Sequence, residues 1–180
     1  MKPALPIEVD PASGVWSTDG LPMIYLPRHF FVNNHVEIEK ALGRAAYAQS
    51  LYAGGYRSAH FWCAQEAATH GLSGLAVAEH YLQRLSQRGW GRFSFIAADV
   101  HSGAAQIALT HSVFVLAQGI AGVPVRSDKL CYLFAGWFAG AMDWVGEDLG
   151  ERWRTFSRET QCEAEGHAHC VFTVSALGAR

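Results

Sequence analysis

Apolar residues recur with helical spacing through the first half of the chain, behind a polar N-terminal stretch. The segment 33–55 predicts a helix, because Asn34 is followed three residues later by Glu37, a pattern that begins many helices. A Gly–Gly pair is expected to end this helix, and a second helix is predicted over 56–71. A third is predicted over 74–89, where five apolar side chains share one face: Leu75, Ala78, Tyr81, Leu82 and Leu85.

The pattern changes after residue 89. Segments 90–100 and 104–115 are rich in aromatic and β-branched residues, and the polar turn between them predicts a β-hairpin. The segment 127–150 predicts a fourth helix, and 152–162 and 169–177 predict two last strands. This order of elements indicates an α+β domain with an antiparallel sheet packed against helices. Four small residues of the fourth helix would let another backbone approach closely: Ala135, Gly136, Ala139 and Gly140.

The N-terminal stretch differs in composition from the rest. Residues 1–29 are rich in proline, glycine and aspartate and predict an extended arm. Within and just after it, 21–31 is either a short strand or a loop, because prolines interrupt an apolar run. Residues 30–180 are expected to form one domain, since the length suits a single core and no repeat or linker interrupts it. The start of the sequence lacks the apolar core of a signal peptide.

Composition narrows the class of protein. Half of the 180 residues are hydrophobic and 17% are charged, which excludes a disordered chain. The net charge of −2 without a basic segment argues against nucleic acid as a partner. No apolar run reaches the roughly 20 residues of a membrane helix, so membrane insertion is not expected. A cytoplasmic location follows as the default. Because that compartment is reducing, the four cysteines of the chain should be thiols or metal ligands and not disulfides.

Two cysteines bracket a polar turn near the end of the chain, in "RETQCEAEGHAHCVF". A hairpin could bring Cys162 and Cys170 to one ion, with Cys131 as a further ligand. Glu159 could join them only if the chain bends, because residues three apart on a regular strand face opposite sides. Further donors in the turn are His167 and His169. The alternatives are unrelated buried thiols or a cross-hairpin disulfide.

The same residues carry a resemblance. The segments "CYLFAGWFAGAMDWV" and "ETQCEAEGHAHCVF" resemble the 4-vinyl reductase domain family. The similarity is close over 124–175 and looser back to about residue 30. The residues that match the family motif are Cys131, Ala135, Gly136, Gly140, Glu159, Cys162, Gly166, Cys170 and Phe172.

The resemblance implies a fold and a metal. Domains of this family are similar in fold to subunits of the TRAPP vesicle-tethering complex. They include the effector-binding domains of bacterial regulators that sense phenols and other aromatic compounds. In the phenol sensors, zinc is held by residues that match Cys131, Glu159, Cys162 and Cys170. Four protein ligands leave no open position, so the resemblance implies a structural zinc ion.

The resemblance also implies a ligand pocket between the first hairpin and the helix that is predicted to carry the first cysteine, Cys131. The phenol sensors have there a tryptophan that binds the phenol hydroxyl, and Leu109 takes its place. Because a buried hydroxyl without a partner is costly, a larger and more apolar ligand is expected. The alternative is that these side chains only pack a core. The positions that match or neighbour the pocket are Trp90, Ile107, Leu109, Trp137, Ala141, Trp144 and Val145.

These observations favour a stand-alone sensor or carrier for a hydrophobic or aromatic compound. The sequence has no phosphate-binding loop and no evident DNA-reading helix, so its output would need a partner protein. It also shows no dinucleotide fingerprint or catalytic triad, which leaves enzymatic activity without support. The alternatives are an accessory protein to a reductase or to tetrapyrrole (bacteriochlorophyll) synthesis, and a dimeric interaction scaffold. A homodimer is expected in each case, with 35–53 and the fourth helix as the candidate surface.

The remaining histidines and the fourth cysteine show no ligand spacing. The histidines are expected to lie at the surface or in hydrogen bonds. Cys63 is expected to be a buried core thiol. The histidines concerned are His60, His70, His80, His101 and His111.

Overall fold

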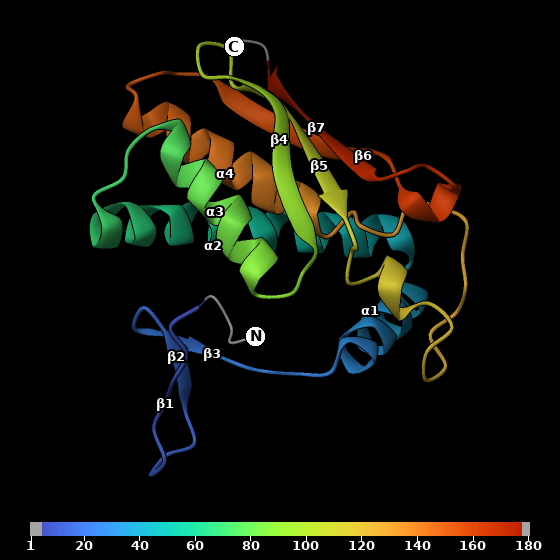
Figure 1. Ribbon diagram of the computed structural model, residues 1–180. Coiled ribbons are helices and arrows are strands. Elements are labelled where there is room, and N and C mark those ends of the chain that lie inside the picture. Colours follow the sequence, from blue (N-terminus) through green and yellow to red (C-terminus); the bar gives the residue numbers. More distant parts are fainter. Residues whose placement is uncertain (1–4, 178–180) are drawn as a thin grey trace.

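Two antiparallel sheets and four α-helices make up residues 5–177, the part of the chain that the computed structural model describes (Figure 1). The smaller sheet contains β1 (Glu8–Val9), β2 (Trp16–Thr18) and β3 (Leu21–Met23). The larger sheet has the order β4-β5-β7-β6, with β4 (Arg92–Asp99), β5 (Ala104–Thr110), β6 (Arg154–Gln161) and β7 (Cys170–Leu177). The helices are α1 (Arg28–Leu42), α2 (Arg44–His70), α3 (Leu75–Gln87) and α4 (Phe134–Asp148), and the short 3-10 helices are η1 (Val115–Ala117) and η2 (Glu163–Glu165). The predicted α+β class is confirmed.

Helix α4 is central to the fold, because it packs against β6 and β7 on one side and against α2 on the other. Two glycines allow the close approach to α2. A Cβ atom at Gly136 would lie 2.2 Å from the carbonyl oxygen of Tyr52, and one at Gly140 would lie 2.3 Å from that of Tyr56. The small residues predicted for this helix therefore serve packing within the chain.

The boundaries of the first two helices differ from the sequence prediction. The first helix begins at Arg28 and ends before Gly43, whose φ of +78° is favourable only for glycine. The second then continues through Gly54 and Gly55 to His70 instead of ending there. Gly55 leaves room for Trp137 on α4, since a Cβ atom at this position would lie 2.3 Å from the indole ring.

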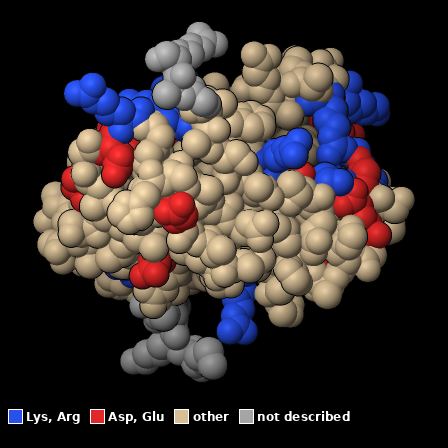
Figure 2. Space-filling view, turned by 90° about the horizontal axis from the view of Figure 1, so that it is seen from above, with Lys and Arg blue, Asp and Glu red and all other residues tan. Residues whose placement is uncertain are grey.

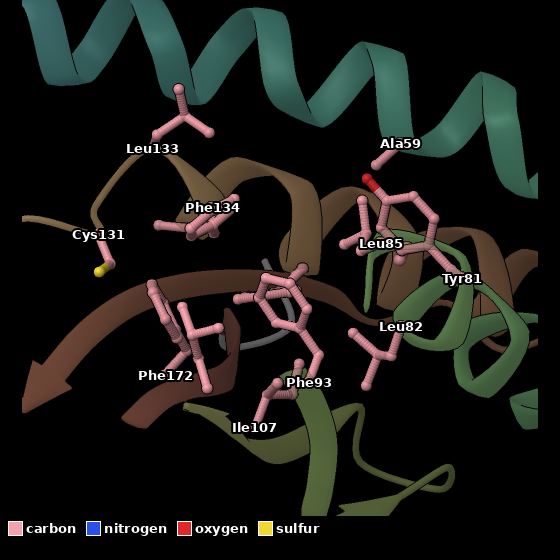
Figure 3. Packing of buried hydrophobic residues seen from close by; sticks show 14 of the residues in the cluster. Ala59, Tyr81, Leu82, Leu85, Phe93, Ile107, Cys131, Leu133, Phe134 and Phe172 are labelled. Atoms are coloured by element: carbon pink, nitrogen blue, oxygen red, sulfur yellow. The ribbon is translucent and has the colours of Figure 1, made fainter. Parts of the chain in front are cut away.

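Aromatic side chains fill the space between α4 and the inner face of the larger sheet. Phe138 and Phe172 are in edge contact with ring centroids 4.8 Å apart, and Phe93 contacts Phe134 at 5.2 Å. Figure 3 shows the rings of Phe93, Phe172 and Phe134 converging from β4, β7 and α4, with Cys131 at the margin of the same cluster. The core and the cysteine cluster are therefore continuous.

The predicted N-terminal arm pairs with itself. Its three short strands form a sheet that projects away from the helices in Figure 1. At the β2–β3 turn, Asp19 accepts a hydrogen bond of 2.5 Å from the Arg84 guanidinium on α3. This pair is largely buried and attaches the small sheet to the helices. The division into an arm (1–29) and a domain (30–180) stays a prediction.

Charged residues are sparse on the surface seen in Figure 2. Uncharged side chains dominate this face, and most of its lysines and arginines occur in small groups near acidic residues. The described residues visible there form no continuous basic patch. Among residues 5–177, none of the helices is both long and apolar enough to cross a bilayer.

Candidate metal centre

Three thiols and one carboxylate converge at the edge of the core. Their ligand atoms lie within 4.8 Å of one another, and all four residues are buried: Cys131, Glu159, Cys162 and Cys170. The sulfur of Cys170 is 3.7 Å from that of Cys131 and 3.6 Å from that of Cys162. Ligands on a tetrahedral ion with Zn–S bonds of about 2.3 Å are separated by about 3.8 Å. The structure thus brings together the four residues that the family resemblance implied as metal ligands.

A β-bulge in β6 explains how Glu159 reaches this cluster. The partners of Glu159 and Gln161 are consecutive residues of β7, so Thr160 is an extra residue in the strand. The bulge shifts the inward-facing register by one position. Glu159 and Cys162, three residues apart, therefore both face the interior, which a regular strand would not allow.

The turn that follows holds Cys162 in place. Its backbone N–H donates a hydrogen bond of 3.0 Å to the Glu165 carboxylate at the end of η2. The backbone N–H of Glu163 donates to the sulfur of Cys170 at 3.3 Å, and such contacts stabilise a thiolate. The side chains predicted as spare donors, His167 and His169, are not part of the cluster.

Burial of the cluster disfavours negative charge on most of its members. Desolvation raises the pKa of Glu159, and the neighbouring Cys162 raises it further. Desolvation also raises the pKa of the Cys131 thiol, with a further contribution from its thiol neighbours. Cys162 differs, since hydrogen bonds from Cys131 and Cys170 lower its pKa. The cluster therefore accommodates one thiolate readily, and a bound cation is needed to hold the others ionised.

One atom of the cluster lacks a partner altogether. Oε1 of Glu159 is buried without a hydrogen bond, while Oε2 accepts one of 2.9 Å from the backbone N–H of Cys131. A buried carboxylate oxygen without a partner is costly, and a metal ion would satisfy it. The donor set therefore fits a metal ion.

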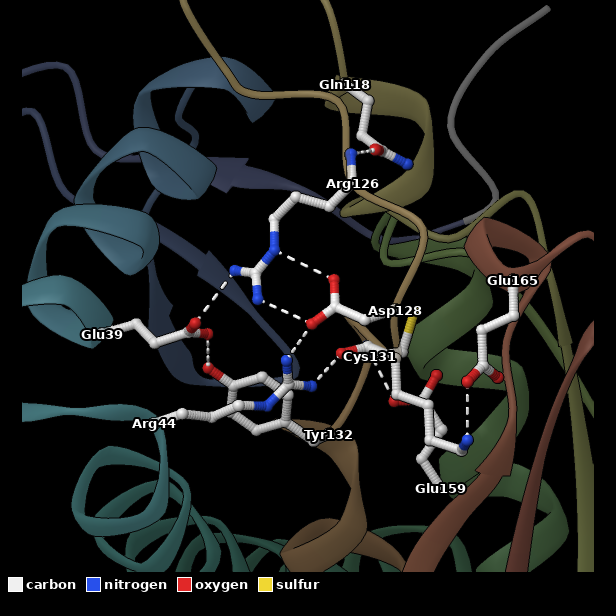
Figure 4. A network of polar contacts seen from close by, with 10 residues as sticks. Glu39, Arg44, Gln118, Arg126, Asp128, Cys131, Tyr132, Glu159 and Glu165 are labelled. Carbon is white, nitrogen blue, oxygen red and sulfur yellow. Dashed lines mark hydrogen bonds and ion pairs between the residues drawn. The ribbon is translucent and has the colours of Figure 1, made fainter.

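Cys131 lies in the loop before α4 and not on the helix, contrary to the sequence prediction. An ionic network fixes this loop (Figure 4). Arg44 at the start of α2 bonds to Asp128 and to the carbonyl of Lys129. Arg126 bridges Asp128 at 2.7 Å and Glu39 of α1 at 2.9 Å. The network ties the loop to two helices that are distant in sequence.

Ser112 is a further neighbour of the cluster that was not predicted from the sequence. The hydroxyl of Ser112 lies 2.9 Å from the Cys131 sulfur and is fully buried. It also accepts a hydrogen bond of 3.3 Å from the backbone N–H of Phe114. A serine in the segment after a strand carries no sequence signal for such a role, because the contact depends on the fold.

The seven predicted pocket residues lie in and beside the aromatic core. Four of them are almost fully buried: Ile107, Leu109, Ala141 and Val145. The tryptophans are partly exposed, and Trp90 meets Trp137 edge to face at 5.1 Å. Phe134 contacts both rings. The structure thus places these residues together in packed surroundings, and the pocket stays a prediction.

A small cavity of about 20 Å³ lies elsewhere, between α1, η1 and the loop before α4. The space suits a water molecule. None of the seven predicted pocket residues lines it. Its wall includes His35, which is 5% exposed and contacts Phe114 and Tyr132. Desolvation lowers the pKa of His35 to about 4, so its imidazole is neutral at pH 7.

The architecture is shared with solved structures of three kinds. The phenol-responsive sensory domain of the transcription activator PoxR, solved with phenol, superimposes with a TM-score of 0.73 at 16% identity over 94% of this chain and 84% of that chain. The trafficking protein particle complex subunit 3 from Naegleria fowleri, covalently bound to palmitic acid, superimposes with a TM-score of 0.57 at 12% identity. The match covers 83% of this chain and 95% of that chain. A vinyl-4-reductase family protein from Methanocaldococcus jannaschii superimposes with a TM-score of 0.52 at 12% identity, over 86% of this chain and 84% of that chain. The predicted resemblance is thereby confirmed at the level of the fold.

The chain therefore shares its fold with these sensory, trafficking-complex and vinyl-4-reductase family structures. Residues 1–96 match the family described as a domain of unknown function, DUF5943. The match covers more than half of the chain, so the chain belongs to this family. No curated protein matches it.

Proposed function

We propose that this chain is a small-molecule-binding domain, a sensor or carrier for a hydrophobic or aromatic compound, with a structural zinc ion. The buried cluster of three cysteines and a glutamate carries the proposal. Thiolates favour zinc over hard cations such as Mg²⁺ and Ca²⁺. Because the four protein ligands complete a tetrahedral site, the ion would be structural and not catalytic.

Zinc would hold the larger sheet to the loop that begins α4. Cys162 and Cys170 belong to the β6–η2–β7 hairpin, whereas Cys131 precedes α4 by three residues. The ion would fix the angle between this hairpin and the helix, and hence the width of the space between them. Ligand contacts on α4 would in this way be coupled to the hairpin.

Two of the structural neighbours support a hydrophobic ligand. Phenol is present in the sensory domain of PoxR, and palmitic acid is attached to the trafficking subunit. In this chain the corresponding space would lie among the seven predicted residues between β4, β5 and α4. Ile107 and Leu109 offer no hydrogen bond there, which favours an apolar compound. Since Phe93 and Phe134 pack into this region, ligand entry would require their rings to move.

A homodimer and a cytoplasmic location belong to the same proposal. The predicted α4 surface packs against α2, so a dimer would use the remaining part of the predicted surface on α1. Ile38 and Leu42 are 43% and 58% exposed there. A reducing compartment suits the four free thiols of the described chain. Output would pass through a partner protein that reads the ligand-bound state.

Native mass spectrometry of protein purified without denaturation tests the proposal. The expected result is one zinc ion per chain, a dimeric mass, and a hydrophobic compound retained from the expression host or taken up from an added panel of aromatic and acyl compounds. Elemental analysis should give the same zinc content. A metal-free protein that remains folded would contradict the zinc site. Failure of every compound to bind zinc-loaded protein would contradict the sensor or carrier function.

A further inference from the structure

A second group of metal-ligating side chains lies at the other end of α2. Glu66 and His70 are four residues apart on this helix, and His80 faces them from α3. Their ligand atoms lie within 4.8 Å of one another. Glu66 is 22 positions beyond Arg44, which contacts the Cys131 loop, and this corresponds to about 33 Å along the helix. The group is thus separate from the cysteine cluster.

The spacing suits direct coordination. Both imidazoles point at one oxygen of Glu66: Nε2 of His80 is 2.7 Å from Oε2, and Nε2 of His70 is 3.3 Å from it. Ligands bound at about 2.1 Å to one ion are separated by about 3.0 to 3.4 Å in octahedral or tetrahedral geometry. Small side-chain rotations would therefore place an ion among the three atoms. The i, i+4 spacing on α2 keeps Glu66 and His70 on one helix face.

The surroundings hold two of the ligands and leave the third accessible. Glu66 is 1% exposed, whereas the His70 side chain is 31% exposed and gives an approach from solvent. The Trp62 ring stacks on His80 at 5.9 Å and restricts its orientation. A rigid pair of ligands with one accessible partner is suited to an ion that exchanges with solvent.

Nearby charges determine which ion the group can take. Nε of Arg84 lies 3.7 Å from the Glu66 carboxylate and donates a hydrogen bond of 3.3 Å to Nε2 of His80, a contact that a metal ion would displace. Nη2 of Arg84 pairs with Asp19 at 2.5 Å. Desolvation lowers the pKa of the Arg88 guanidinium, and the nearby Glu66 carboxylate opposes this shift. Two carboxylates and two guanidinium groups leave no net negative charge to attract Ca²⁺ or Mg²⁺, which bind mainly through oxygen. Inner-sphere bonds from two imidazoles favour a transition metal instead.

We propose that Glu66, His70 and His80 bind a divalent transition-metal ion. Two imidazoles and one carboxylate leave coordination positions for water or a small ligand, unlike the four-ligand cysteine cluster. The ion is held more weakly than one bound by three thiolates, because Arg84 opposes it. The proposal is independent of the function proposed above.

Cobalt titration of the 180-residue protein tests this site. The protein is first dialysed to remove weakly held ions, and Co²⁺ is then added while visible and near-ultraviolet absorption is recorded. We expect one equivalent of Co²⁺ to produce d–d bands without a thiolate-to-cobalt charge-transfer band. A charge-transfer band would report entry into the cysteine cluster, so the two sites are distinguished in the same experiment.

Three variants assign the ligands. His70→Gln and His80→Gln should each weaken this Co²⁺ binding by at least about tenfold, the loss that even groups orienting a ligand can cause. His60→Gln is the matched control, because His60 lies on the same helix and contacts a single carboxylate, Glu147, at 2.8 Å. It should leave Co²⁺ affinity unchanged. The proposal is overturned if no thiolate-free Co²⁺ equivalent binds, or if His70→Gln and His80→Gln bind it as tightly as the parent protein.

Discussion

The carboxylate of Glu159 accepts a hydrogen bond of 2.9 Å from the backbone N–H of Cys131, across 28 residues of sequence. This bond occupies Oε2 and leaves Oε1 buried without a partner at the cysteine cluster. One side chain thus orients the loop before α4 and presents an oxygen to the place where a metal ion would lie. The two roles can be separated by substitution.

Glu159→Gln should keep the first role and lose the second. The amide oxygen can still accept the hydrogen bond from Cys131, but the neutral side chain is a much poorer zinc ligand. We expect metal affinity, measured by competition with a chromophoric chelator, to fall by about 10- to 100-fold. Glu79→Gln, at an exposed position of α3, should have no effect. Equal zinc affinity in both variants would exclude the carboxylate as a ligand.

Cys162→Ser should remove the ion altogether. Structural zinc contributes on the order of 10 kcal/mol in small domains, so the free energy of unfolding should fall by more than about 3 kcal/mol. Chelator treatment of the parent protein should reproduce this loss and should not destabilise the variant further. Cys63→Ala is the control, because Cys63 is equally buried but lies outside the cluster. It should retain zinc, and unchanged metal content and melting in Cys162→Ser would refute the site.

Features of the fold that depend on local sequence patterns were predictable from the sequence. Hydrophobic periodicity and turn residues predicted the α+β class and both hairpins of the larger sheet. The full set of four clustered residues came from the resemblance to the 4-vinyl reductase domain family, since spacing alone left Glu159 open. Features that depend on distant contacts were not accessible in this way. The bulge at Thr160 that turns Glu159 inward is visible only in the pairing with β7. The Ser112 contact with Cys131 and the convergence of His70 with His80 likewise arise only when separate elements pack together.

The glycines of the first two helices show the same difference between local pattern and tertiary contact. A Gly–Gly pair normally predicts a helix end, yet both glycines are helical here, and Gly55 leaves room for the Trp137 indole. At Gly43 no neighbour constrains the position, and the positive φ ends α1. The sequence alone does not tell which of these glycines interrupts a helix.

Gly136→Ala should be strongly destabilising. Its new methyl group would meet the backbone of Tyr52 on α2, which cannot move aside as a side chain would. We expect a loss of about 1–3 kcal/mol or more in denaturant unfolding. Gly54→Ala is the matched control, because nothing lies within 4 Å of the added methyl group. There the helix should gain about 0.5–1 kcal/mol, and effects of the same sign would contradict the close α2–α4 packing.

Leu109→Ala tests the region of the predicted pocket. Leu109 is fully buried on β5 against Gly91, and its truncation should cost about 2–5 kcal/mol and leave a cavity. Because the surrounding side chains are aromatic and aliphatic, added benzene should raise the melting temperature of this variant more than that of the parent. Leu116→Ala, at a position 39% exposed, should show neither effect. Absence of benzene stabilisation in Leu109→Ala would argue against ligand binding in this part of the core.

The decrease in the free energy of unfolding at acid pH should depend on His35. Desolvation lowers its pKa from 6.5 to about 4 in the folded chain, although Glu39 opposes the shift while Arg126 and Arg44 favour it. Between these values the unfolded chain binds a proton that the folded chain does not, so stability falls as pH falls from 6.5 to 4. At 1.36 kcal/mol per pKa unit, the contribution is on the order of 3 kcal/mol.

His35→Phe would remove this titration and keep an aromatic ring against Phe114 and Tyr132. Its free energy of unfolding, measured in denaturant from pH 7 to pH 4, should therefore decline less steeply than that of the parent. Loss of metal at low pH affects both proteins and cancels in the difference. His101→Gln, at an exposed hairpin turn, should follow the parent curve. If His35→Phe also follows it, the imidazole is not held neutral by burial, and the acid sensitivity arises elsewhere.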